Sequence, residues 1–283
     1  DGDSDSATVD LTAERTGLTT GEFAYALNFS DDGPTAKYND EVVSFDDDEI
    51  VIDGAAPTLI VDETAGQQDD PEDNVSDRVS KEDFSAFFAN DTTEATPTGD
   101  DDVDFGADNA GTVAYKIELT KGPADTQVLV DGSGVESGLY AVDETSGGKG
   151  DQILLYNNGG AIEGRIGGAA GVLYFTVAVD GSGEMTLTQA SLDAANPISI
   201  WHPTDTEHDE VVSLDGEGDL EASQTVTYHI NLTQTVTDAD GDSDSATVDL
   251  TAERTGLTEG EFAYALNFSD DGPTAKYNDE VVS

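Results

Sequence analysis

Apolar and polar residues alternate with a period of two along several stretches of the chain. In residues 225–237 the apolar side chains that share one face are Val226, Tyr228, Ile230, Leu232 and Val236. The same alternation recurs in residues 113–119, 173–179, 245–253 and 261–269. Because successive side chains of a strand point to opposite faces, each stretch predicts a strand with one buried face. The pattern is typical of an all-β sandwich.

Short glycine-containing segments separate these stretches and predict tight turns, for example at residues 131–132, 147–148, 159–160, 180–181 and 215–216. Only one segment has helical spacing. Ser80 and Asp83 resemble a capping box, and Phe84, Phe87 and Phe88 follow. We therefore expect a short helix that plugs one end of the sandwich. A second short helix is expected around residues 187–195.

A long internal repeat organises the chain. Residues 1–44 recur as residues 240–283 and differ only at Thr20 and Glu259, which sets a period of 239 residues. Such near-identity indicates recent duplication and a tandem array. We expect the chain to be an excised piece, because it opens at Asp1 rather than at Met.

The repeat predicts four parts. Residues 1–34 end a preceding, truncated repeat; residues 35–56 form an acidic linker; residues 57–273 form one full repeat; and residues 274–283 begin the next linker. The first copy is expected to pair poorly, to complete a truncated sandwich, or to compete with the second copy for one site.

The charge of the chain restricts its partners. It has 10 Lys and Arg against 62 Asp and Glu, a net charge of −52. This excludes nucleic acid and anionic membranes as partners, and no stretch is apolar enough for membrane insertion. Divalent cations or high salt are needed to screen such charge. Without Cys there are no disulfides. We expect a monomer whose partners are neighbouring repeats of the same chain.

The sharpest candidate site is an acidic loop. Asp238, Asp240, Asp242 and Asp244 alternate across seven residues, with Gly241 allowing the chain to turn. Calcium takes six to eight oxygen ligands, which carboxylates and backbone carbonyls of a curled loop supply. The alternative is a solvated acidic hairpin. The first copy keeps only three of the acids, so its site is expected to be weaker: Asp1, Asp3 and Asp5.

Acidic pairs on both sides of the predicted linker form a second candidate site. Asp31 and Asp32, which recur as Asp270 and Asp271, end one unit. Asp62 and Glu63 begin the next. An interdomain calcium clamp would use both pairs, and the alternative is exposed linker charge. Weaker acidic clusters lie at residues 46–48, 69–73 and 100–104.

Residues for catalysis are not evident, and we expect no enzyme. The chain lacks a thiol nucleophile, a G-x-S-x-G elbow, a P-loop and an HExxH sequence. The histidines are His202, His208 and His229. The first two belong to a loop that Trp201 anchors, with a transition-metal site as the alternative, and His229 is expected to face solvent.

The run at residues 236–243, followed by an alternating strand, resembles the last strands of Ig-like repeats in giant RTX adhesins. Residues 138–142, 151–156 and 201–210 add to the resemblance. It implies an Ig-like antiparallel β-sandwich at the bacterial cell surface, exported by type I secretion and loaded with Ca²⁺. It also implies an extender role, in which calcium-stiffened modules hold a ligand-binding domain away from the cell.

Carried over residue by residue, the resemblance matches Asp238, Asp240, Asp242 and Asp244 to the acidic loop of the family. Asp62 and Glu63 match its unit-start acids. The long junction at residues 36–55 departs from the family pattern. The alternative function is a calcium-dependent carbohydrate-binding module, for which Tyr140, Tyr156 and Trp201 are the candidate aromatic residues.

Overall fold

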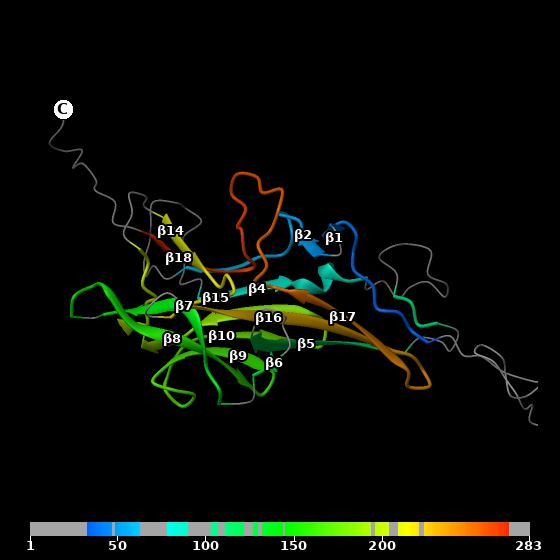
Figure 1. Ribbon diagram of the computed structural model, residues 1–283, viewed down its shortest axis with the longest axis horizontal. Coiled ribbons are helices and arrows are strands. Elements are labelled where there is room, and N and C mark those ends of the chain that lie inside the picture. The colour runs from blue at the N-terminus through cyan, green and yellow to red at the C-terminus, as the bar shows by residue number, and fades with distance from the viewer. Residues whose placement is uncertain are drawn as a thin grey trace, which may run out of the picture.

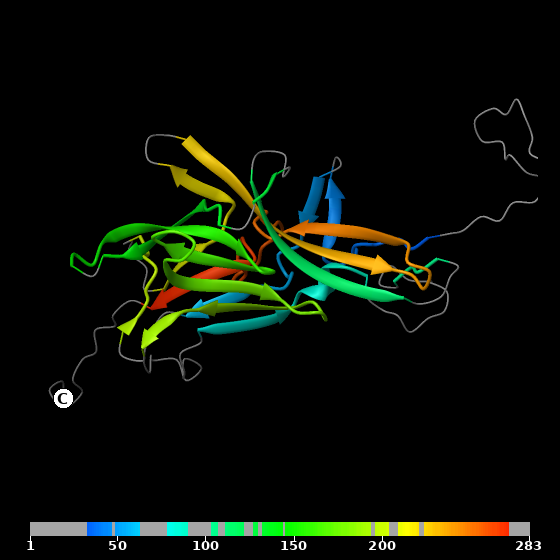
Figure 2. The same cartoon turned by 90° about the horizontal axis from the view of Figure 1, so that it is seen from below.

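A computed structural model describes most of the chain between residues 33 and 271. The described ranges are 33–46, 49–62, 78–89, 103–106, 111–121, 127–129, 132–143, 145–193, 196–203, 209–220 and 224–271. They contain eighteen strands and one short 3-10 helix, η1. The predicted all-β, sandwich-like fold is confirmed (Figure 1, Figure 2). Among these residues there is no helix long and apolar enough to cross a bilayer.

The largest sheet is an antiparallel meander of six strands. Its order is β4 (Val79–Asp83), β11 (Glu184–Gln189), β10 (Val172–Val179), β9 (Ala161–Ile166), β8 (Lys149–Asn158) and β7 (Val135–Val142). Tight glycine turns join its consecutive strands, as the sequence predicts. Gly159 and Gly160, between β8 and β9, both have positive φ (61° and 92°), which the two central residues of a type I′ turn require.

The second sheet is built on one long strand, β16 (Gln224–Thr237). Its order is β15 (Glu217–Leu220), β16, β5 (Thr112–Lys121) and β6 (Gln127–Val128), and β17 (Ser243–Asp249) pairs with the second half of β16. β16 and β5 stay in register over ten residues, from Tyr228 opposite Lys121 to Thr237 opposite Thr112. Alternation in both strands, which only the buried Gln234 interrupts in β16, favours this register, because a one-residue slip would turn the apolar side chains outward.

A three-stranded sheet joins the two ends of the described chain. β18 (Leu266–Asp271) lies between β14 (Asp209–Ser213) and β3 (Leu59–Asp62). It is antiparallel to β14 and parallel to β3. Two small hairpins complete the described strands: β1 (Val43–Asp46) with β2 (Glu49–Ile52), and β12 (Ser191–Asp193) with β13 (Asn196–Pro197).

One hydrophobic core lies between the sheets. β5 packs across β8, β9 and β10, and it presents the buried side chains of Ile117 and Leu119. β18 joins the same core through Phe268, whose ring centroid lies 4.8 Å from that of Phe175 on β10. The Tyr228 hydroxyl donates a hydrogen bond to the Ser137 carbonyl (3.1 Å), which ties β16 to β7, and burial raises the pKa of Tyr228 well above its ordinary value.

The predicted helices need correction. Ser80 is a strand residue of β4, and only Phe84–Phe87 form the 3-10 helix η1. Its N-cap is Asp83, whose side chain accepts a hydrogen bond from the Ser85 amide. β4 pairs with β11 up to Asp83, and this pairing overrides the capping-box pattern. The phenylalanines are buried, as expected of a plug.

The second predicted helix, around residues 187–195, is wrong. Leu187 lies in β11, where it faces Ser80 on one side and Val177 on the other. Residues 191–193 form β12. The predicted strand at residues 261–269 also begins later, at Leu266, because residues 254–263 form a loop in which the Arg254 amide donates to the Ala263 carbonyl.

Residues 35–56, the predicted linker, pack on the body of the fold where they are described. Val43 is 1% exposed and Ile52 is 2% exposed, and both belong to the main core. The Asn39 amide donates to the Phe87 carbonyl, and the Asp53 amide donates to Val42. Whether these residues also connect two repeats stays a prediction.

Arg254 fixes the segment that leads into β3. Its guanidinium is buried and donates hydrogen bonds to the carbonyls of Ala56 and Pro57 and to the Thr58 hydroxyl. Burial lowers the pKa of Arg254 to about 10, and the negative charge of Glu261 opposes this shift. Arg254 thereby connects the loop before β18 to the chain before its parallel partner.

We expect Arg254→Met to lower the free energy of unfolding by about 2–3 kcal/mol, because one buried and two partly buried acceptors lose their donor. Urea unfolding followed by circular dichroism measures this change. The control is Lys116→Met, which removes only a surface pair with Glu118 and should cost less than about 1 kcal/mol. Equal effects of the two substitutions would contradict the structural role of Arg254.

Candidate metal centre

The predicted acidic loop is the turn between β16 and β17. Thr237 ends β16 opposite Ser243, which begins β17, so residues 238–242 form the turn. Gly241 has φ of 109°, a conformation that other residues rarely adopt. The long β16–β17 hairpin therefore places three aspartates in five consecutive residues at its tip.

Asp238 organises this turn. Its Oδ1 atom accepts hydrogen bonds from the amides of Gly241 and Asp242, both at 2.9 Å. Its own amide donates to the Asp242 carbonyl at 3.0 Å. Asp238 is only 5% exposed, although it lies in a surface turn. Its Oδ2 atom is buried and has no hydrogen-bond partner.

The carboxylates of the turn converge. Asp238, Asp240 and Asp242 each offer one oxygen, and these three atoms lie within 4.8 Å of one another. Burial raises the pKa of Asp238, but hydrogen bonds from the amides of Gly241 and Asp242 help to outweigh it, and the pKa is lowered. Asp238 is therefore a carboxylate at neutral pH, and like charges are held close together.

These residues fit a hard divalent cation. All three side chains present oxygen, with no nitrogen or sulfur ligand among them, which suits calcium or magnesium better than zinc or copper. A buried carboxylate oxygen without a partner is costly, and a bound cation would satisfy it. Calcium takes six to eight oxygens, so water and backbone carbonyls would supply the remainder.

The fourth predicted ligand, Asp244, has another role in the structure. It lies in β17, and its Oδ2 atom accepts a hydrogen bond from the Ala36 amide at 3.0 Å. Gly33 lies beside the same turn: a Cβ atom added to it would be 3.8 Å from the Cβ atom of Asp242. The acidic turn therefore borders the first described residues of the chain.

The second predicted site is only partly described. Asp62 ends β3 opposite Ser269, so its neighbours along β18 are Asp270 and Asp271 of the same unit. Those two residues face Glu210 and Asp209 on β14. The backbone of Asp62 therefore lies next to the acidic end of its own unit. The clamp between two units stays a prediction. The predicted site residues outside the described part are Asp1, Asp3, Asp5, Asp31, Asp32 and Glu63.

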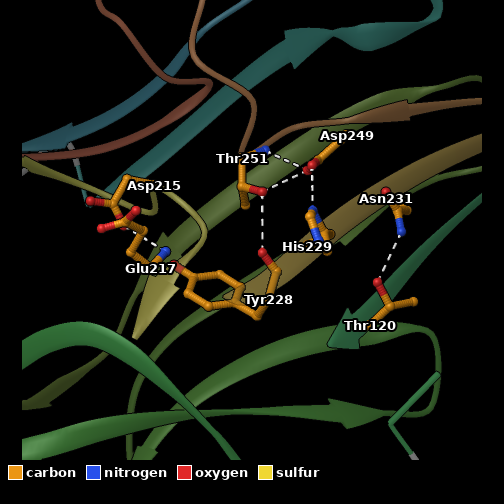
Figure 3. Close-up of polar contacts among 8 residues, drawn as sticks. All are labelled: Thr120, Asp215, Glu217, Tyr228, His229, Asn231, Asp249 and Thr251. Atoms are coloured by element: carbon orange, nitrogen blue, oxygen red, sulfur yellow. Dashed lines mark hydrogen bonds and ion pairs between the residues drawn. The ribbon is translucent and has the colours of Figure 1, made fainter. Parts of the chain in front are cut away.

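Sequence reasoning missed a polar network on the opposite half of the β16–β17 pair (Figure 3). His229 Nδ1 lies 2.6 Å from Asp249 Oδ2. The other Asp249 oxygen accepts hydrogen bonds from the Thr251 amide (2.9 Å) and hydroxyl (2.6 Å). Because Asp249 pairs with Asn231 rather than with His229, the contact is diagonal across the strands, and alternation alone does not reveal it.

The other predicted residues do not converge on this network. His202 is buried, and His208 lies outside the described residues. The three aromatic residues considered for carbohydrate binding have different environments. Tyr156 is buried in the core, whereas the rings of Tyr140 and Trp201 lie under Lys149. The Lys149 Nζ atom is 3.5 Å from the centroid of the Tyr140 ring and 5.6 Å from that of the Trp201 ring. Carbohydrate binding by these aromatic residues stays a prediction.

We expect His229 and Asp249 to be coupled. In a double-mutant cycle with His229→Gln and Asp249→Asn, the coupling energy should be about 0.5–1.5 kcal/mol, because the pair is half-buried and charge-assisted. Urea unfolding of the four proteins at one pH measures it. The cycle of Lys81→Gln and Glu184→Gln, an exposed pair, is the control and should give a smaller value. Additive effects for His229 and Asp249 would refute the coupling.

Comparison with known proteins gives one match. A family model described as "Domain of unknown function (DUF5801)" matches residues 58–251, more than half of the chain. Neither a curated protein nor a solved structure matches.

Proposed function

We propose a function for this chain on the premise that it belongs to the DUF5801 family, which is described only as a domain of unknown function. The chain is a calcium-stabilised spacer repeat of a large bacterial surface adhesin. It binds calcium in the β16–β17 turn, works outside the cell after type I secretion, and holds ligand-binding domains away from the surface. Its direct partners are neighbouring repeats.

The buried carboxylate of Asp238 carries the calcium part of this proposal. Its Oδ2 atom is buried without a hydrogen-bond partner, and one oxygen of its carboxylate lies within 4.8 Å of an oxygen of Asp240 and of an oxygen of Asp242. The amide hydrogen bonds to Oδ1 hold Asp238 in the turn, but they leave Oδ2 desolvated and unpaired, which costs free energy. A hard cation removes both the desolvation cost and the mutual repulsion.

The net charge of −52 gives calcium a wider effect than local ligation. Repulsion among the carboxylates favours an expanded chain, and bound divalent cations reduce this repulsion. A cation that binds the folded state and not the unfolded chain stabilises the fold by mass action. Secretion of an expanded chain into millimolar calcium would then be followed by folding.

The spacer part of the proposal is supported by the repeat and by the shape of the described unit. Residues 1–44 recur as 240–283 with one difference, which is typical of tandem arrays. The first described residues lie beside the β16–β17 turn, while β18 lies toward the other end of the long axis (Figure 1, Figure 2). A chain that enters and leaves at opposite ends suits modules strung in a line.

Removal of calcium should destabilise the protein. At free calcium of about one hundred times Kd, binding contributes about 2.7 kcal/mol. Chelation with EGTA at constant ionic strength should therefore lower the Tm by about 5–10 °C in scanning calorimetry. An unchanged Tm would remove the calcium part of the proposal and leave the spacer part supported by the repeat alone.

Substitutions in the turn locate the site. Asp238→Asn and Asp242→Asn should each abolish most of the calcium-dependent shift in Tm. The matched control is Asp3→Asn, since Asp3 is the counterpart of Asp242 in the other copy, with identical neighbours but no counterpart of Asp238. Titration calorimetry with calcium checks the affinity directly. If Asp3→Asn reduced the shift as much as Asp242→Asn, the site would not be the β16–β17 turn.

A further inference from the structure

Residues 33–38, which precede β1, cover the free edge of strand β17. β17 pairs with β16 on one side, and residues 33–38 run along it on the other. The Tyr38 hydroxyl donates to the Thr247 carbonyl (2.9 Å) and accepts from the Thr247 amide (3.2 Å). One side chain thus satisfies both backbone groups of an edge residue, which blocks pairing with another strand.

The rest of the N-terminal segment is fixed to the C-terminal part of the fold as well. Asp53 forms a parallel bridge with Thr255, whose amide donates to the Ile52 carbonyl at 3.0 Å. Arg254 binds the carbonyls of Ala56 and Pro57. The Tyr38 ring packs on Phe45 and Phe88, at centroid distances of 5.5 and 6.1 Å. Residues 33–58 therefore belong to the same folded body as β17 and β18.

The extent of this body equals the sequence period. The period is 239 residues. The contacts of the body run from Gly33, which lies beside Asp242, to Asp271, which pairs with Asp209 on β14, and this span is also 239 residues. Both end segments of the body occur twice in the chain: residues 33–44 recur as 272–283, and residues 240–271 correspond to 1–32. Of these repeated segments, residues 33–44 and 240–271 are the copies that the structure describes in contact with the body, and with residues 45–239 they make up one period without overlap.

We propose that residues 33–271 form one folded module and that successive modules of the array are joined directly at the bond between residues 271 and 272. The surface formed by β17 and the β16–β17 turn then receives the chain as it leaves β18 of the preceding copy. The partner of this surface is a second copy of the same module. The inference takes the array from the proposed function and does not depend on calcium.

This boundary brings the two acidic ends of consecutive modules together. Asp270 and Asp271 end β18 of one module. The next residue, Gly272, is the counterpart of Gly33, which lies beside Asp242. Because neighbouring Cα atoms are about 3.8 Å apart, the backbone of Asp271 of one module would lie one residue from the glycine that borders the acidic turn of the next. The linker predicted at residues 35–56 is then part of each module rather than a spacer between modules.

The repeat supplies a matched test in the full chain. Tyr38 and Tyr277 have the same neighbours, but only Tyr38 has a β17 strand of its own module to cover. Tyr38→Ala should lower the Tm by about 6 °C or more, whereas Tyr277→Ala should change it by less than about 1 °C. Tyr38→Phe and Tyr277→Phe give the same comparison, with smaller shifts, if the alanine variant does not fold.

Extension of the chain tests the junction. Residues 45–271 added after Ser283 complete a second module, and in this longer protein Tyr277→Ala should become as destabilising as Tyr38→Ala. Equal effects of the two substitutions in the original chain, or no gain in the effect of Tyr277→Ala on extension, would overturn the proposal. All comparisons are made in one buffer, so they stand apart from the effect of calcium removal.

Discussion

Repulsion among carboxylates limits where this fold can place its acidic residues. With 62 acidic and 10 basic residues, the fold must exclude negative charge from its interior and distribute it over turns and ends. Within the part of the chain whose side chains the structure describes, Asp238 is the only buried acid and Arg254 the only buried Lys or Arg. Asp238 lies in the turn that is proposed to hold a cation. The guanidinium of Arg254 lies among carbonyl oxygens.

Much of the fold follows from alternation in the sequence. The strands around Ile117, Phe175, Ile230 and Val248 are where the pattern places them, and their apolar faces form the core. The position of the acidic turn also follows from the sequence, because Gly241 interrupts two alternating stretches; cation binding there stays a prediction. The alternation predicts the strands of these regions well because they pair with strands close in sequence or are themselves unusually long.

The rest depends on contacts between distant segments. The sequence at Ser80 and Asp83 has the capping-box pattern, but both residues form a strand because β4 pairs with β11. The segment at residues 35–56 has a linker-like composition, yet a few apolar residues such as Val43 and Ile52 fix it to the core. The parallel pairing of β3 with β18 joins residues about two hundred positions apart. The contact between His229 and Asp249 is diagonal, and composition holds no signal for it.

The parallel β3–β18 pair also determines how the module responds to tension. In the proposed array, a pull on both ends would leave on the C-terminal side of β18, and it would reach β3 after the contacts of Ala36, Tyr38 and Ala56 with the body of the module have broken. Since these strands run in the same direction and are hydrogen-bonded over Leu59–Asp62, they are drawn past each other lengthwise. Their backbone hydrogen bonds then break together in shear instead of opening one after another. Shear geometry raises the force needed for rupture, which would suit the spacer role proposed above.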